Sequence, residues 1–241
     1  RALTLVLAWM WLVVGVISLL MMFVLGPSPL KVIANNENAP PQMILVTQVI
    51  MLGTLGCMYL FLPGIFILFY QSKHVKATCD YHDPHVRWTD KCPLPVLALS
   101  LMLASGAFSM IYSASYGFVV PFFGILLKGV AGALLILIIS LLFAYLSWAT
   151  YKLKMAAWWG TIAVYVLFGV STIITFSRFS MLDFYREMNF PDEQLRILEK
   201  TGVLENMNMP LMVGVGVAVF VGYMLWVRKY FVAQVVASGD S

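Results

Sequence analysis

Charged side chains are scarce in this sequence: Asp, Glu, Lys and Arg together make up 11% of its 241 residues. An average soluble domain carries about 25% charged residues, so too few are present here to coat a globule in water. Hydrophobic residues make up 61%, and the mean hydropathy is +0.90. Several apolar runs exceed the roughly 18 residues that read as a membrane span. The composition excludes a water-soluble globule and predicts an all-α, polytopic membrane protein.

Motifs that carry chemistry are missing as well. The sequence has no P-loop, no G-x-S-x-G, no H-E-x-x-H and no N-x-[ST] glycosylation acceptor. Its three cysteines do not form the framework of a secreted disulfide scaffold. No Asp, Glu or His falls inside an apolar segment, whereas ion-coupled transporters usually place such groups near the midplane. We therefore expect a protein that is not an enzyme and has no cofactor, zinc being the one candidate.

Six apolar segments predict a bundle of six transmembrane helices that forms a single domain over residues 1–241. The first segment is too long and continuous for a signal peptide, and no small-residue cleavage site follows it. The chain begins with Arg1, which is compatible with further residues upstream. The second segment contains Pro63-Gly64, where a kink is expected. The segments are about 3–25, 43–70, 94–113, 121–148, 156–176 and 210–227.

The loops differ in their content of Lys and Arg, which predicts how the chain is oriented. One side has nine: Arg1, Lys73, Lys76, Arg87, Lys91, Lys152, Lys154, Arg228 and Lys229. The other side has five: Lys31, Arg178, Arg186, Arg196 and Lys200, the last four in a loop with six acids. We expect a multi-pass protein of the plasma or inner membrane with both termini and loop 71–92 in the cytoplasm. The net charge of +4 then reflects topology, and the expected partners are the lipid bilayer and other membrane protein subunits, not nucleic acid.

The outer loop, residues 177–209, carries two helical patterns. Met181, Phe184, Tyr185 and Met188 have the spacing of one helix face. After the following proline, "DEQLRILEKTG" has acids in its first turn, a lysine near its end and a glycine stop. The loop therefore predicts two short amphipathic helices that lie on the outer surface or cover the outer ends of the spans.

Loop 71–92 holds the one cluster of metal-ligand residues: Cys79, His82, His85 and Cys92. Thiolates stay reduced in the cytoplasm, and two thiolates with two imidazoles can close a tetrahedral zinc site. Familiar sites of this kind use two close pairs separated by a dozen or more residues, and here all four residues lie within fourteen. The alternative is a solvated loop that caps the third span, and this is the result we expect from metal analysis.

Three further features each have a functional and a structural interpretation. Lys128 interrupts the fourth apolar segment, either as a functional intramembrane lysine or as one that reaches the outer interface. Met207, Met209 and Met212 have the thioethers that suit Cu(I), although methionine is abundant throughout. Small residues suggest close helix packing or a partner face. They are Gly53 and Gly56, Gly129 and Gly132, and Gly214, Gly216 and Gly222.

These patterns favour a non-enzymatic structural or accessory subunit, or the membrane anchor of a larger assembly. The first alternative is a channel or transporter for a small or weakly polar solute, with broken helices at Pro63-Gly64 and near Pro121 lining the path. The second is a cytoplasmic-facing metal or thiol sensor built on the four Cys and His residues of loop 71–92.

Overall fold

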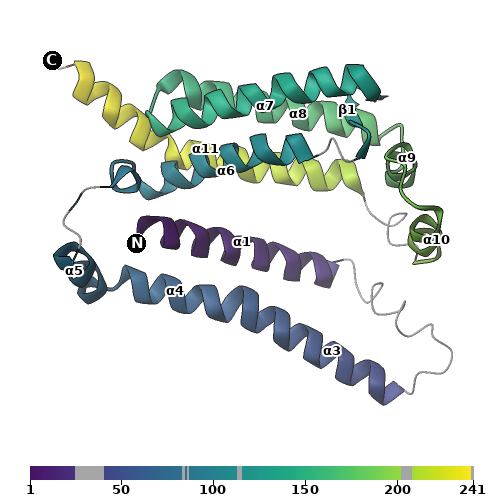
Figure 1. Cartoon of the computed structure of the whole chain (residues 1–241), viewed down its shortest axis with the longest axis horizontal. Coiled ribbons are helices and arrows are strands. Elements are labelled where there is room, and N and C mark those ends of the chain that lie inside the picture. The colour runs from purple at the N-terminus through teal and green to yellow at the C-terminus, as the bar shows by residue number, and fades with distance from the viewer. Residues whose placement is uncertain (25–40, 83–84, 86, 113–115, 202–207, 240–241) are drawn as a thin grey trace. The chain divides into compact units, whose positions relative to one another are not determined.

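The computed structural model of the chain describes residues 1–24, 41–82, 85, 87–112, 116–201 and 208–239. The chain divides into two compact units. Unit 1 contains Arg1–Leu94, and unit 2 contains Pro95–Lys200 and the C-terminal helix (Figure 1). The single domain expected over 1–241 stays a prediction.

Unit 1 is a pair of antiparallel helical runs followed by short helices. The Arg1 side chain donates from Nε to the Tyr70 carbonyl oxygen at 3.0 Å, and the Trp11 ring meets the Tyr59 ring at 6.2 Å. The two runs therefore pass in opposite directions. In chain order the elements are α1 (Ala2–Val24), α3 (Pro41–Gly56), the π-helical turn η1 (Cys57–Phe61), α4 (Leu62–Gln71), α5 (Lys73–His82) and the 3-10 turn η2 (Trp88–Asp90).

The π-helical turn η1 lies immediately before Pro63, where the sequence predicts a kink. The Leu62 amide donates to the Cys57 carbonyl five residues earlier, and Pro63 has no amide hydrogen to donate. The Tyr59 backbone lies directly against Gly15 of α1: a Cβ on Gly15 would be 2.5 Å from the Tyr59 Cβ and 2.7 Å from its carbonyl oxygen. Only glycine fits here, and this contact fixes α1 on the π turn.

Unit 2 is a bundle of four long helices with a small hairpin and two short helices at one end (Figure 1). The α6–α7 pair is antiparallel, because Ser100 meets Ser147 while Ala107 meets Ser140. The α8–α11 pair is antiparallel, because Trp158 meets Met224 while Gly169 meets Val217. In chain order the elements are α6 (Leu94–Tyr112), β1 (Val120–Phe122), β2 (Ile125–Leu127), α7 (Gly129–Tyr151), α8 (Met155–Phe176), α9 (Met181–Glu187), α10 (Asp192–Thr201) and α11 (Met209–Gly239).

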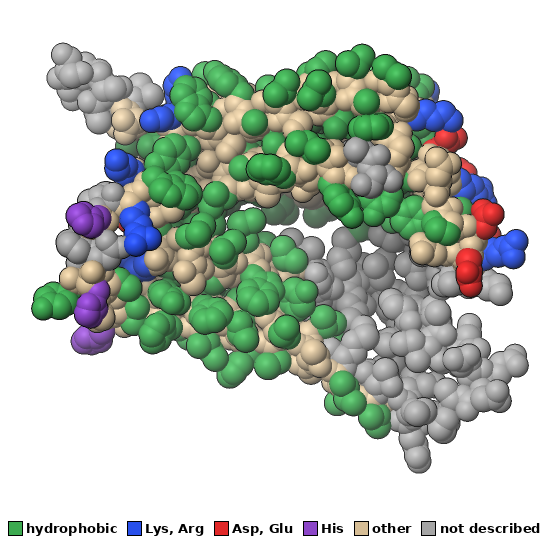
Figure 2. All heavy atoms as spheres, in the orientation of Figure 1, with side chains coloured by type: hydrophobic (Ala, Val, Ile, Leu, Met, Phe, Trp, Pro, Cys, Tyr) green, Lys and Arg blue, Asp and Glu red, His purple; other side chains and the backbone are tan. Residues whose placement is uncertain are grey.

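Five helices in the described part of the chain are long and apolar enough to cross a membrane: Leu52–Gln71, Leu94–Tyr112, Gly129–Tyr151, Met155–Phe176 and Met209–Gln234. They fit an integral membrane protein, as the composition predicts. Figure 2 shows hydrophobic side chains along the helices and charged ones gathered at the helix ends. The described apolar part of α1, Ala2–Val16, is shorter, so the sixth span stays a prediction.

One predicted boundary is wrong. The helix of the fourth span begins at Gly129 and not at 121, because residues 120–127 form an antiparallel hairpin. Phe123 and Gly124 both have positive φ, 41° and 89°, as in a two-residue type I′ turn. An apolar run does not distinguish strand from helix by itself. The last helix continues to Gly239, twelve residues beyond residue 227, where the sixth apolar segment ends.

Close helix contacts occur at only part of the predicted small-residue set. A side chain at Gly132 would collide with the Phe118 carbonyl oxygen, whereas nothing lies within 4 Å of a Cβ on Gly53. Gly169 of α8, which the sequence analysis did not single out, packs against Val217 of α11. Gly56, Gly129, Gly216 and Gly222 likewise have no such neighbour among the described residues.

Candidate functional site

The hairpin of unit 2 is fixed to α8 by two buried hydroxyl groups. The Phe123 amide donates to Ser171 Oγ at 2.9 Å, and the Gly124 amide donates to Thr175 Oγ1 at 3.0 Å. Ser171 and Thr175 are one helical turn apart and both are buried. Non-helical backbone at a membrane is tolerated only where its polar groups find partners in the protein or in water. These hydroxyls provide the partners that the turn amides need.

Strained backbone concentrates at this end of the unit. The described non-glycine residues with positive φ include Phe118 at 56°, Phe123 at 41° and Asn189 at 54°. Such conformations are rare for bulky side chains and cost on the order of 1–3 kcal/mol each, and they cluster at functional sites. Phe118 precedes the hairpin, Phe123 forms its turn, and Asn189 follows α9. This makes the region the best candidate for a built site, and we call it the hairpin end: residues 116–129 with α9 and α10.

Ion pairs hold the two short helices in place. Lys128 Nζ lies 2.7 Å from Glu187 Oε2 of α9, and Arg186 Nη2 lies 2.6 Å from Glu199 Oε1 of α10. Arg186 also meets Asp183, whose pKa is lowered mainly by the hydrogen bond from the Ser180 hydroxyl. All of these groups are exposed, so each pair contributes about 0–1 kcal/mol. Their role is to orient the short helices.

The sequence predicts that Lys128 lies inside the fourth spanning helix. In the structure it lies just before that helix. It is the N-cap residue of α7, with extended backbone, and its ammonium group pairs with an acid outside the spans. The prediction that Lys128 interrupts a spanning helix is wrong, because the residues before it form the hairpin.

Apolar contacts dock α9 in the manner that its spacing predicts. Met181, Phe184, Tyr185 and Met188 are all partly buried, and the Phe184 ring meets Phe176 of α8 at 5.6 Å. In α10, Leu195 is buried while the described acids are exposed. Two short helices thus exist in this segment. Their place on the outer membrane surface stays a prediction.

A shallow cavity of about 380 Å³ opens at the hairpin end. Its wall includes the stacked rings of Tyr116 and Phe190, 5.9 Å apart, and the Tyr185 ring meets Phe190 at 5.0 Å. Asn189 and Gln194 add amide groups beside the rings. Gly117, Met188 and Pro191 complete the lining. Flat aromatic faces with a few amides can recognise a peptide or another polar organic group.

The predicted metal site does not assemble among the described residues. Cys79 is half-buried in α5, His82 ends that helix and is exposed, and His85 is exposed. Cys92 is buried, and burial raises the pKa of its thiol to about 11. No three His, Cys, Asp or Glu residues of the described chain are grouped to hold a metal ion. Metal binding by this loop stays an untested hypothesis.

The methionine cluster is only partly visible. Met207 lies outside the described residues, and Met209 and Met212 lie in the first turn of α11. The copper interpretation stays a hypothesis.

Polar groups within the spans of unit 2 mostly bind one another. Ser100 and Ser147 each donate to the carbonyl oxygen of the other, at 2.9 and 2.8 Å, and Ser140 donates to the Ala107 carbonyl at 2.9 Å. Such bonds connect membrane helices. The buried hydroxyls of Thr150 and Thr161 have no partner among the described residues, and nothing in the structure explains them.

The chain matches no protein family model, no curated protein and no solved structure to which it was compared. Its role must be argued from its own residues. The sequence analysis missed Ser171, Thr175, Phe118 and Asn189.

Proposed function

We propose that this chain is a non-enzymatic membrane subunit that acts as a structural or accessory component, or as the anchor, of a larger assembly. The observation that carries the proposal is the hairpin end. There the chain maintains strained backbone, orients two helices by ion pairs and exposes an aromatic cavity. The hydroxyls of the spans, by contrast, serve mainly to hold the helices together. We propose that the hairpin end binds a protein partner.

The proposed orientation places the hairpin end outside the cell and both termini in the cytoplasm of a plasma or inner membrane. It is supported by the charges of unit 2. Four cations of unit 2 gather at the end of α8 that is opposite to Ser171 and Thr175. We call them the basic end: Lys152, Lys154, Arg228 and Lys229. Helix α8 has 22 residues, about 33 Å, which spans a hydrocarbon core of about 30 Å.

Site-directed photocross-linking in native membranes tests the proposal. A photoreactive residue in place of Gln194, which lines the cavity, should give one discrete protein adduct. The same residue at Leu134, an exposed position on α7, should label lipid. Lys128→Glu should reduce the Gln194 adduct, since it breaks the pair with Glu187, and Lys128→Glu with Glu187→Lys should restore it. An adduct at Leu134 but none at Gln194 would refute the proposal.

A transport function is the second candidate, and the π-helical turn in the span Leu52–Gln71 favours it. Turns of this kind occur frequently at functional sites. The other break expected to line a path, Pro121, belongs to a strand. Proteoliposomes diluted into an isosmotic glycerol solution test this candidate. Swelling no faster than that of empty liposomes supports the subunit, and faster swelling supports the channel.

A further inference from the structure

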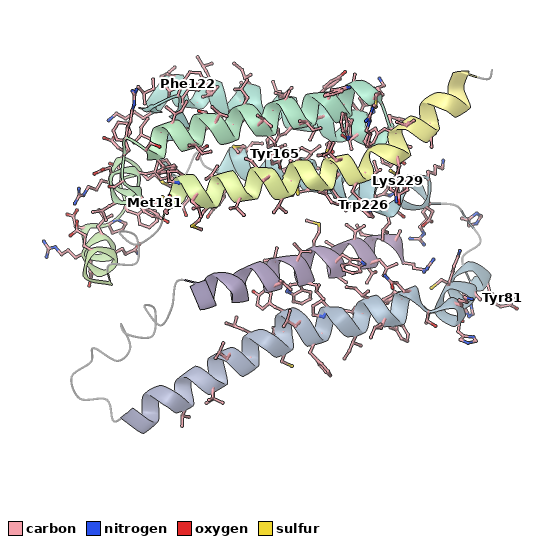
Figure 3. All side chains as sticks on the ribbon, turned by 180° about the vertical axis from the view of Figure 1, so that it is seen from behind. Tyr81, Phe122, Tyr165, Met181, Trp226 and Lys229 are labelled. Atoms are coloured by element: carbon pink, nitrogen blue, oxygen red, sulfur yellow. The ribbon has the colours of Figure 1, made fainter. Side chains whose placement is uncertain are left out.

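The cations at the basic end of unit 2 lie on aromatic rings instead of carboxylates. The described acids of unit 2 all belong to α9 and α10, at the hairpin end. The basic end therefore carries positive charge that no described acid of the unit offsets. Figure 3 shows Lys229 and Trp226 together on α11. The five pairs are Lys152 with Tyr151 at 6.0 Å, Lys154 with Trp148 at 4.4 Å, Arg228 with Trp158 at 5.6 Å, and Lys229 with Trp226 at 4.9 Å and with Tyr230 at 5.1 Å.

Arg228 is the best placed of these cations to bind an anion. The Trp158 ring beneath it is 2% exposed, and its Nε1 donates to the Met224 carbonyl at 2.7 Å. A guanidinium group that stacks on a fixed ring keeps its N–H edge free for oxygen atoms, and its planar fork fits phosphate.

A shallow apolar groove of about 590 Å³ begins at Trp159, the residue after Trp158, and follows one face of α8. The Trp159 ring, which lines the groove, meets the Trp158 ring at 4.6 Å. Every residue of the lining is apolar, and Phe123 of the hairpin turn contributes at the far end. The helix residues of the lining are Trp159, Ile162, Ala163, Val166, Leu167 and Val170.

The length of the groove matches one leaflet of a bilayer. From Trp159 to Val170 the helix rises eleven residues, about 16 Å at 1.5 Å per residue. The hydrocarbon core is about 30 Å thick, so half of it is about 15 Å. An acyl chain that enters the groove at Trp159 would have its headgroup at the end of α8 where Arg228 lies over Trp158.

We propose that unit 2 binds an anionic phospholipid, with the phosphate held by Arg228 and the neighbouring lysines and one acyl chain in the α8 groove. The inference does not depend on the protein partner proposed for the hairpin end. It predicts a lipid that stays with the chain in mild detergent and stabilises it.

Thermal-shift titration of the full chain in mild detergent tests the proposal. The probes are phosphatidylglycerol, phosphatidylcholine with the same chains, and inorganic phosphate. Phosphatidylglycerol should raise the melting temperature at the lowest concentration. Arg228→Gln should weaken its binding roughly fivefold, the contribution of one basic residue near an anionic lipid. Ala163→Trp, which fills the groove, should weaken the binding of both lipids.

Two matched variants serve as controls. Arg196→Gln removes a positive charge from α10, and Ala144→Trp adds the same bulk at an exposed position of α7. Neither should change the affinity for phosphatidylglycerol, and each shift is measured against the same variant without lipid. Equal affinity for both lipids, an equal shift with phosphate alone, or equal losses in the controls would overturn the proposal.

Discussion

Gly15 and Tyr59 are in direct backbone contact, 44 positions apart in the chain, where the π-helical turn of one run meets α1. The π turn is the consequence of Pro63, four residues after Tyr59. The missing side chain at Gly15 allows this turn to approach the backbone of α1. Unit 1 therefore depends on a pairing between a helix irregularity and a missing side chain.

Gly15→Ala should destabilise unit 1. The added methyl group collides with the Tyr59 backbone, which cannot move aside as a flexible side chain would, and overpacking of this kind costs typically 1–3 kcal/mol. Gly53→Ala is the matched control, because nothing lies within 4 Å of its Cβ. Unfolding in detergent, followed by circular dichroism, measures both. Equal losses of stability in the two variants would contradict the contact between Gly15 and Tyr59.

Thr175→Val should loosen the hairpin. The substitution keeps the shape of the side chain but leaves the Gly124 amide buried without an acceptor, at a cost of about 1–3 kcal/mol. Hydrogen exchange of residues 116–128 should then accelerate. Thr172→Val, one position from Ser171 on the same helix, should leave that segment unchanged. A hairpin protected equally in both variants would show that the hydroxyl does not hold the turn.

The thiol of Cys92 should react far more slowly than that of Cys79. Its pKa is raised from 9.0 to about 11 by burial, so at pH 8 it holds about a hundredfold less thiolate than an ordinary cysteine. A raised pKa favours the protonated folded state, so the stabilisation is complete below pH 9 and is lost as the pH rises to about 11. Maleimide labelling with peptide mapping measures the two rates. Equal rates in folded protein would contradict the burial.

The topology predicts sidedness of labelling. A cysteine in place of Gln194, exposed in α10, should react with a membrane-impermeant maleimide in intact cells. Native Cys79 should react only after the membrane is opened. Labelling of Cys79 from outside would show that the chain has the opposite orientation.

Metal analysis tests the Cys and His loop. The described residues show no assembled site, and we expect zinc near zero in purified protein. The Cys79 thiol should then react with a thiol reagent to the same extent with and without chelator. About one zinc per chain, lost in each of Cys79→Ser, His82→Ala, His85→Ala and Cys92→Ser, would establish the metal site instead.

The helices were predictable because long apolar runs leave few alternatives to a spanning helix. The kink region of the second span was also foreseen, since Pro63 cannot donate a helical hydrogen bond. The hairpin was not, because "VPFFGILL" is as apolar as a helix, and its structure depends on hydroxyls about fifty residues later in the chain. The error at Lys128 followed from the same segment. A tertiary partner of this kind leaves no local pattern.

The distance along the chain between the hairpin and its acceptors also constrains how the protein is made. Thr175 follows Gly124 by 51 residues. At about 5–20 residues per second, the ribosome adds these residues in roughly 3–10 s. During that time the two turn amides have no partner in the chain, so the hairpin segment stays hydrated. Burial of the hairpin turn must therefore wait until the Ser171 and Thr175 hydroxyls of α8 have been synthesised.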